Sequence, residues 1–186
     1  MQQRMRRSGL ILGLVALGGL ALTAGSAQAD SGPGPYYAEP AWSQQLPIAT
    51  RFVVLTDWTN DAVLDKETGL VWERAPANTS TQGWGTARTV CTARTTGARK
   101  GWRLPSVHEL ASLIHPNVPG QTLPSGHPFL NVQSANYWSS TSDVDNPTFA
   151  WGVLFVDGRV YLLNKFLYSV PIFAWCVRGG MNAAAY

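Results

Sequence analysis

The sequence predicts an α+β fold in which two helices pack on short antiparallel sheets and long loops join the elements. Apolar residues with helical spacing are confined to the middle of the chain, between residues 84 and 114. Segments typical of strands lie before and after this part, over 52–73 and 137–178. This order indicates an α+β protein, because a parallel sheet would need strands and helices that alternate.

The middle part predicts two helices and a tight connector. In the first helix Ala87 and Cys91 are four residues apart, so they share one face. The second begins with an S-x-x-E capping box, in which the side chains of Ser106 and Glu109 each accept a hydrogen bond from the backbone N–H of the other. The connector carries Trp102 as a large anchor. Each helix has one apolar face, which the sheets are expected to cover.

Strands are predicted on both sides of the helices. The three earlier ones cover 52–55, 62–65 and 70–73, and the last two of these flank a hairpin loop that ends in Gly69, a residue suited to positive φ. Asp157-Gly158 is a strong hairpin signal between two of the later strands. The later strands cover 137–141, 149–156, 159–163 and 172–178.

The first residues are typical of an exported protein. Three arginines precede an apolar run over 10–22, and Ala27-Gln28-Ala29 then forms an A-x-A cleavage site. Residues 1–29 are therefore expected to be a Sec-type signal peptide that is cleaved after Ala29. The apolar run is shorter than the ~20 residues of a transmembrane helix. We expect a secreted or periplasmic protein with no membrane span after cleavage.

The remainder is expected to consist of a tether, a domain and a short tail. Residues 30–50 are rich in Pro and Gly and form the tether, residues 51–180 form one domain, and residues 181–186 form the tail. Cleavage removes three of the fourteen basic residues, which leaves eleven basic and eleven acidic side chains. A near-neutral protein gives no argument for a nucleic-acid partner.

The chain has two cysteines, Cys91 in the first helix and Cys176 near the C-terminus. In an exported protein such a pair is expected to form one disulfide. The alternative is a reactive or metal-binding thiol, which would need a basic neighbour or a C-x-x-C spacing, and the sequence shows neither. Closing a loop of about 85 residues would stabilise the domain by ~4 to 5 kcal/mol in the chain-entropy model.

Four segments, in this order, resemble the motifs of one family. Residues 64–72 (LDKETGLVW) resemble TDxxTGLxW, and residues 101–110 (GWRLPSVHEL) resemble WRLPTxxEL. Residues 137–141 (YWSST) resemble YWSSS, and residues 176–178 (CVR) resemble the closing RCVR. The chain is similar in these motifs to the Lcl C-terminal domain family, which is named for a bacterial collagen-like adhesin.

The resemblance implies a C-type-lectin-like fold, in which a helix cysteine pairs with a cysteine on the final strand. That pairing agrees with a Cys91–Cys176 disulfide. The resemblance also implies binding more than catalysis, because the adhesin's domain is associated with sulfated polysaccharides such as glycosaminoglycans. This sequence contains no collagen Gly-X-Y repeat, so the resemblance does not extend to trimerisation or surface display.

A cluster of basic residues on and after the first helix is the candidate binding site. Arginine forks suit sulfate, carboxylate and phosphate groups. The alternative is a solvated helix face balanced by the acidic residues between 57 and 73. Arg103 and Arg178 lie inside the family motifs, so we expect structural hydrogen bonds for them. The candidate anion-binding residues are Arg88, Arg94, Arg99 and Lys100.

No metal site, cofactor or catalytic group is predicted. Calcium prefers six to eight oxygen ligands, and Asp143 and Asp145 are the only carboxylates close together in the long loops. The spacing of His108, His115 and His127 matches no common zinc pattern. No serine lies in a G-x-S-x-G motif.

The tryptophans are expected to divide between core and surface. Trp58 and Trp42 lie outside the family motifs and are expected to be the more exposed, and Trp58 is a candidate for stacking on a sugar ring. Those expected in the core are Trp72, Trp102, Trp138 and Trp175.

These observations favour a non-enzymatic binding module whose ligand is an anionic polysaccharide or an envelope glycan. The first alternative is a protein-interaction module of an envelope or appendage assembly. Its contact surface would be the long loop over 115–133, with Phe129 and Leu130 as anchors on the domain. The second alternative is an envelope enzyme whose catalytic group the sequence does not indicate.

Overall fold

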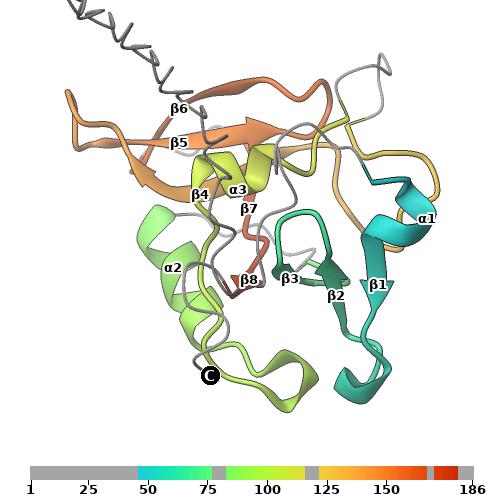
Figure 1. The fold of residues 1–186 in the computed structure, drawn as a ribbon. Helices are drawn as coiled ribbons and strands as arrows, with labels where there is room; N and C mark the ends of the chain where they lie inside the picture. The colour runs from blue at the N-terminus through green and yellow to red at the C-terminus, as the bar shows by residue number, and fades with distance from the viewer. Residues whose placement is uncertain (1–45, 77–82, 116–121, 167–169, 180–186) are drawn as a thin grey trace, which may run out of the picture. The chain divides into compact units, whose positions relative to one another are not determined.

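The computed structural model describes residues 46–76, 83–115, 122–166 and 170–179, and its ribbon is drawn in Figure 1. Within these residues the fold is α+β, as the sequence predicts, with two four-stranded sheets. No helix in this part of the chain has the length and apolar character needed to cross a bilayer. The predicted signal peptide and tail, and Trp42, lie outside the described residues. The α-helices are α1 (Ile48–Arg51), α2 (Trp84–Thr92) and α3 (Val107–Ala111).

The first sheet has the strand order β1-β2-β3-β8, and all its pairs are antiparallel. Strands β2 and β3 have the predicted bounds, and Gly69 in the loop between them has a φ of 69°. A 3-10 helix, η1 (Thr56–Trp58), leads from β1 towards β2. The strands of this sheet are β1 (Phe52–Val54), β2 (Ala62–Asp65), β3 (Leu70–Glu73) and β8 (Val177–Arg178).

The second sheet has the order β6-β5-β4-β7. The pairs β4–β5 and β5–β6 are antiparallel, whereas β4 and β7 are parallel, so the prediction of antiparallel sheets is wrong for this pair. Figure 1 shows β5 and β6 on the side of the molecule away from β1 and η1. The strands of this sheet are β4 (Asn136–Ser142), β5 (Phe149–Leu154), β6 (Val160–Asn164) and β7 (Ile172–Phe173).

The hairpin between β5 and β6 is wider than predicted. Strand β5 ends at Leu154 instead of residue 156, and the Gly158 N–H donates to the Leu154 carbonyl over 2.8 Å. The cause is Phe155, whose side chain is buried and whose ring centroid lies 4.9 Å from that of Tyr137. Because Phe155 turns into the core at the strand end, the chain needs a longer loop before β6.

The last segment, 172–178, forms two short strands instead of the one that is predicted. Strand β7 belongs to the second sheet and β8 to the first, so this segment joins the two sheets. Its side chains still alternate between two buried clusters, as in a strand. Phe173, Trp175 and Val177 belong to one cluster, and Ile172, Ala174 and Cys176 belong to the other.

These two clusters form the core. The four tryptophans predicted to be buried are at most 2% exposed and are shared between the clusters. The aromatic cluster contains Phe52, Trp72, Phe129, Tyr137, Phe155, Phe173 and Trp175, with aliphatic side chains of β2, β5 and α3. The disulfide cluster contains Ala62, Ala87, Cys91, Trp102, Leu104, Trp138, Ala150, Leu163, Ile172, Ala174 and Cys176.

The capping box of α3 is confirmed. The Ser106 hydroxyl accepts from the Glu109 N–H over 3.2 Å, and the Glu109 carboxylate accepts from the Ser106 N–H over 2.7 Å. Leu110 and Leu113 are fully buried in the aromatic cluster, and α3 packs on β4 and β5. The second predicted helix therefore exists, with its apolar face covered by the second sheet.

The fold begins before the predicted domain boundary at residue 51, because α1 and a buried ionic group lie there. Arg51 is fully buried, and its guanidinium contacts Asp65 at 2.7 Å and Glu67 at 2.9 Å. The Leu46 N–H donates to Glu67 over 3.1 Å. A buried charge is strongly destabilising when its partner is removed. This group therefore holds the end of the predicted tether on the first sheet.

Candidate functional site

Helix α2 is held on the final segment by a covalent bond. Cys91 and Cys176 form the predicted disulfide, with a Cα–Cα distance of 5.3 Å, and both residues are fully buried. Ala87 lies one turn before Cys91 and is also fully buried, so the predicted apolar face of α2 is confirmed. The residues that follow α2 therefore leave from a fixed point beside β8.

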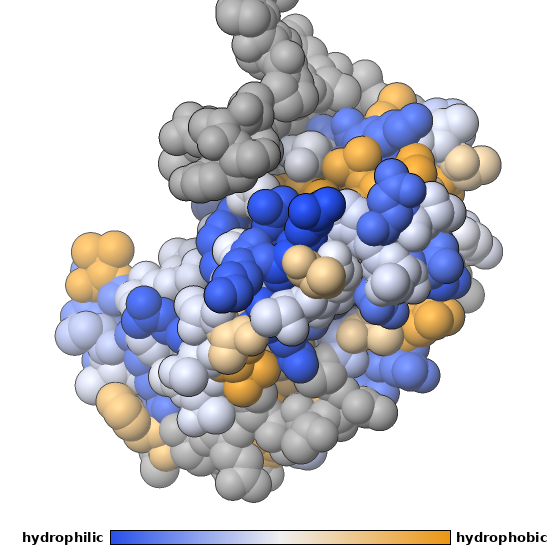
Figure 2. All heavy atoms as spheres, turned by 90° about the horizontal axis from the view of Figure 1, so that it is seen from below, coloured by the Kyte–Doolittle hydropathy of each residue, from blue (hydrophilic) through white to orange (hydrophobic). Residues whose placement is uncertain are grey.

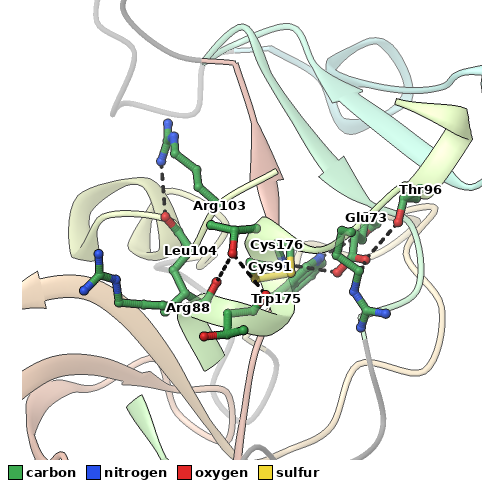
Figure 3. The surroundings of a disulfide bond; sticks show 11 residues. Glu73, Arg88, Cys91, Thr96, Arg103, Leu104, Trp175 and Cys176 are labelled. Carbon is green, nitrogen blue, oxygen red and sulfur yellow. Dashed lines mark hydrogen bonds and ion pairs between the residues drawn. A yellow bond between two sulfur atoms is a disulfide. The ribbon is translucent and has the colours of Figure 1, made fainter. Parts of the chain in front are cut away.

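Glu73, at the end of β3, links this strand to the segment that follows α2 and to the segment that precedes β8, both of which lie beside the disulfide (Figure 3). Its carboxylate forms an ion pair of 3.0 Å with Arg94 and accepts hydrogen bonds from the Thr96 hydroxyl and the Cys176 N–H. Its carbonyl accepts from the indole N–H of Trp175 over 2.9 Å. Burial raises the pKa of Glu73, and these three partners of the carboxylate offset only part of that increase.

An open cavity of about 620 Å³ lies next to Glu73. Two basic residues, Arg74 and Arg94, line it together with the acidic residue Asp61. Arg74 is held by hydrogen bonds to the carbonyls of Pro128 and Asn60. The remaining lining residues are polar or small, apart from Leu130: Thr59, Asn60, Glu73, Ala75, Pro76, Thr96 and Asn131. We refer to this space as the Glu73 cavity.

Beside the cavity, Trp58 supports a group of cationic side chains. The guanidinium carbons of Arg99 and Arg178 lie 5.6 Å and 5.4 Å from the centre of its ring, within the range of cation–π contacts. The Arg178 side chain also donates to the carbonyl of Lys100 over 2.8 Å. Arg99 and Lys100 are exposed, and neither forms an ion pair with a carboxylate of the described residues. Trp58, Arg99, Lys100 and Arg178 together are called the Trp58 rim.

The backbone brings the two sides of the rim into close contact. A Cβ atom on Gly97 would lie 2.8 Å from the Cβ of Trp58, and Gly97 has a φ of 63°, so glycine suits this position. Trp58 itself is half-buried and packs edge-on against Trp102, with ring centroids 6.2 Å apart. Seen from below, strongly hydrophilic side chains gather near the centre of the molecule's face (Figure 2). The loop after β1 and the segment after α2 reach that lower side in Figure 1.

The structure divides the four predicted anion-binding residues among different surroundings. Arg99 and Lys100 belong to the Trp58 rim, and Arg94 is paired with Glu73 in the cavity. Arg88 instead lies over the ring of Trp84 at 4.8 Å, and it extends away from the disulfide on the side opposite Glu73 (Figure 3). The structure therefore does not place all four on one continuous face.

Arg103 has the structural role that its motif predicts. Its guanidinium contacts both carboxylate oxygens of Glu109, at 2.8 Å and 2.7 Å, and donates to the Gly179 carbonyl. Burial raises the pKa of Glu109, but the hydrogen bonds from Arg103 and Ser106 outweigh burial and leave that pKa lowered. Arg103 thus links the start of α3 to the end of β8. Arg178, the other motif arginine, combines a structural hydrogen bond with a place in the rim.

Residues 122–133 of the long loop are held against the core. Phe129 is buried in the aromatic cluster, as predicted. The Leu130 side chain is 47% exposed, so it is not an anchor, although the Leu130 N–H donates to the Arg74 carbonyl over 2.7 Å. Residues 116–121 lie outside the described part. Within the described ranges no group of three or more His, Cys, Asp or Glu side chains is arranged to hold a metal ion.

Sequence patterns did not indicate Glu73, Arg74 or the residues of the loop before β2. Glu73 follows Trp72 at the end of a buried strand, and an acidic residue in such a place is a usable signal because buried carboxylates are paired. Thr59, Asn60 and Asn131 have positive φ and line the cavity, and no local motif marks them in advance.

Comparison with known proteins gives a family for the chain. The family model described as the Lcl C-terminal domain matches residues 61–178. No curated protein matches the chain in sequence. The match includes the cavity residues Asp61, Glu73 and Arg94. It also includes the rim residues Arg99, Lys100 and Arg178, while Trp58 precedes it. Because it covers more than half of the 186 residues, the protein belongs to the Lcl C-terminal domain family.

Proposed function

We propose that this protein is a non-enzymatic binding module for an anionic polysaccharide or envelope glycan, and that the Trp58 rim is where the ligand binds. The observation that carries the proposal is the pair of guanidinium groups, from Arg99 and Arg178, that lie over one tryptophan ring. Arg99 and the next residue, Lys100, are exposed and have no carboxylate partner among the described residues. Guanidinium forks suit sulfate and carboxylate groups in a bidentate geometry.

The Glu73 cavity supports the same proposal. Its volume of about 620 Å³ is within the range of small-molecule sites. Arg74 and Arg94 offer N–H donors to an acidic group, while Asp61, Asn60 and Asn131 offer partners to sugar hydroxyls. An acidic sugar unit of a chain bound along the rim would find both kinds of partner there.

The proposal includes export and a C-type-lectin-like architecture. Residues 1–29 would direct export and be removed, so mass spectrometry of the mature protein should find a chain that begins at Asp30. The bond from a helix to the segment before the final strand supports the lectin-like fold. In such a fold, rigid elements present loops such as those of η1 and the segment after α2.

Retention on immobilised heparin at increasing salt tests the binding proposal. Wild-type protein should be retained at low salt and elute as salt rises, because polyanion binding releases counterions in proportion to the charges engaged. Arg99→Gln with Lys100→Gln should reduce the slope of log affinity against log salt by about one unit for each cationic side chain that no longer neutralises a sulfate.

Two single substitutions serve as matched controls. Arg159→Gln removes an exposed arginine on the hairpin before β6 that is paired with Asp157, and its retention should equal that of the wild type. Arg88→Gln tests the α2 surface separately, and a small effect is expected. Wild-type protein that passes through heparin at low salt would refute the proposal, and a loss confined to Arg88→Gln would move the site away from the rim.

A further inference from the structure

Strand β6 is an outer strand of its sheet, and one side of its backbone has no neighbouring strand among the described residues. Two hydrogen bonds fix which residues face that side. The Leu154 N–H donates to the Arg159 carbonyl, and the Lys165 N–H donates to the Thr148 carbonyl. Because the direction of backbone hydrogen bonding alternates along a strand, Val160 and Leu162 turn their N–H and C=O groups outwards.

The other outer strands of the described part are too short to pair with another chain. Strand β1 has three residues, and β7 and β8 have two each. Strand β6 has five residues, Val-Tyr-Leu-Leu-Asn, without a charge or a proline. Proteins usually protect an outer strand by short length, charge or proline, and β6 carries none of these protections.

The side chains around this edge are apolar and exposed. Val160 is 42% exposed and Leu162 is 37% exposed, and they lie two residues apart on one face of the strand. Val156 (47%) lies in the loop before β6 and Phe166 (69%) lies just after the strand. An open row of backbone groups with apolar side chains on one face fits an extended apolar strand.

We propose that β6 pairs antiparallel with β6 of a second copy of this chain, so that two four-stranded sheets become one sheet of eight strands. A two-fold axis at Tyr161 places Val160 of each copy opposite Leu162 of the other. It also brings Phe166 of one copy to the end of the strand where Val156 of the other copy lies. The edge is therefore complementary to itself.

Charge supports a second copy as the occupant. The strand has no charged residue, so self-pairing brings no like charges together. Arg159 at its start is already paired with Asp157 at 2.6 Å. Lys165 at its end is buried and donates to Ser142 and to the Pro147 carbonyl. The proposal does not depend on what the Trp58 rim binds.

Sedimentation velocity of the protein, produced with its own N-terminal segment, tests the pairing over a range of concentrations. The wild type should form a dimer that dissociates on dilution. Val160→Lys should weaken the dimer at least tenfold, because two ammonium groups would be placed at the new strand pair. Val144→Lys is the matched control: Val144 is 95% exposed and lies outside β6, so the same substitution should leave the dimer unchanged.

Leu162→Lys provides a second variant, and far-ultraviolet circular dichroism with a free-thiol assay establishes that each variant is folded with its disulfide intact. A wild type that stays monomeric at all concentrations overturns the proposal. The proposal is also overturned if the Val160→Lys variant and the Leu162→Lys variant each dimerise as tightly as the wild type. If deletion of residues 30–45 converts a monomer into a dimer, the chain's own N-terminal segment covers β6, and the proposal is equally wrong.

Discussion

The aromatic cluster and the disulfide cluster lie on opposite faces of the same strands but are built from different side chains. In the aromatic cluster, the ring of Trp175 lies between 5.0 Å and 5.8 Å from four other rings. In the disulfide cluster, six of the eleven buried members are Ala or Cys. The aromatic cluster therefore buries large side chains, while the disulfide cluster allows α2 to approach the strands closely.

The two clusters are stabilised in different ways. Burial of apolar area stabilises by about 25 cal/mol per Å², so small side chains contribute little beneath α2. A covalent bond and the Glu73 contacts act there instead. The Trp58 rim extends from this side of the core, since Trp58 packs against the disulfide cluster. Polar and covalent links thus fix the surface that we propose binds the ligand.

Removal of the disulfide should have the largest effect on stability. Cys91→Ala with Cys176→Ala opens a loop with a sequence separation of 85. We expect the free energy of unfolding to fall by about 4 to 5 kcal/mol, because the unfolded chain gains entropy. Urea unfolding followed by tryptophan fluorescence measures the change.

Reduction gives the matched control for this comparison. Dithiothreitol should destabilise the wild type by a similar amount and leave the double variant unchanged. A double variant as stable as the wild type would mean that burial alone holds the disulfide cluster together, and the contrast between the two clusters would fail.

Local patterns predicted the elements better than the connections between them. The bounds of β2 and β3, the capping box of α3 and the cysteine pair follow from spacing and residue type, and the structure contains them. The last segment kept its predicted alternation of side chains, yet it divides between two sheets. Which sheet a strand joins depends on partners far away in sequence, such as β3 for β8 and β4 for β7, and local patterns do not identify these partners.

The candidate site was predicted in part, for a similar reason. Arg99 and Lys100 form a cationic surface, but Arg94 is paired with Glu73, twenty or so residues earlier in the chain, and Arg88 contacts Trp84. The sequence shows where the charged residues lie along the chain, but it does not show which of them are paired with an opposite charge in the folded protein. The sequence predicts that Trp58 is one of the more exposed tryptophans, and the structure shows it half-buried, because Gly97 allows the segment after α2 to pack directly on its ring.

Gly97→Ala should disturb the rim and leave both cysteines unchanged. The substitution places a Cβ atom 2.8 Å from Trp58 at a residue whose φ is 63°. A left-handed backbone costs an L-residue roughly 1 to 2 kcal/mol, so we expect a loss of about 2 kcal/mol with the contact included. Heparin retention should fall as well, because Trp58 has to shift under Arg99 and Arg178.

Gly85→Ala is the control for that variant. Gly85 lies in α2, and an added Cβ would meet nothing within 4 Å. Since alanine favours a helix over glycine by about 0.5 to 1 kcal/mol, this variant should be slightly more stable and should bind heparin as the wild type does. Equal effects of the two substitutions would contradict the contact between Gly97 and Trp58.

Glu73→Gln should give the smallest effect, a change in how stability depends on pH. The pKa of Glu73 is raised above 4.5 mainly by burial. Between the unfolded and folded pKa values the folded protein therefore holds a proton that the unfolded chain has released, so Glu73 lowers stability as pH rises through that range. The free energy of unfolding of the wild type, relative to Glu73→Gln, should decrease above pH 4.5, with a slope below about 1.4 kcal/mol per pH unit.

Glu109→Gln should show the opposite sign, because the pKa of Glu109 is lowered below 4.5. The folded protein has released this proton at pH values where the unfolded chain still holds it, so Glu109 adds stability as pH rises towards 4.5 and loses it as pH falls. Unfolding curves for both variants between pH 3 and pH 7 therefore separate a carboxylate governed by burial from one governed by its arginine. Parallel pH profiles for the two variants would mean that Arg94 stabilises the ionised form of Glu73 as strongly as Arg103 stabilises that of Glu109. Burial of Glu73 would then not decide its protonation.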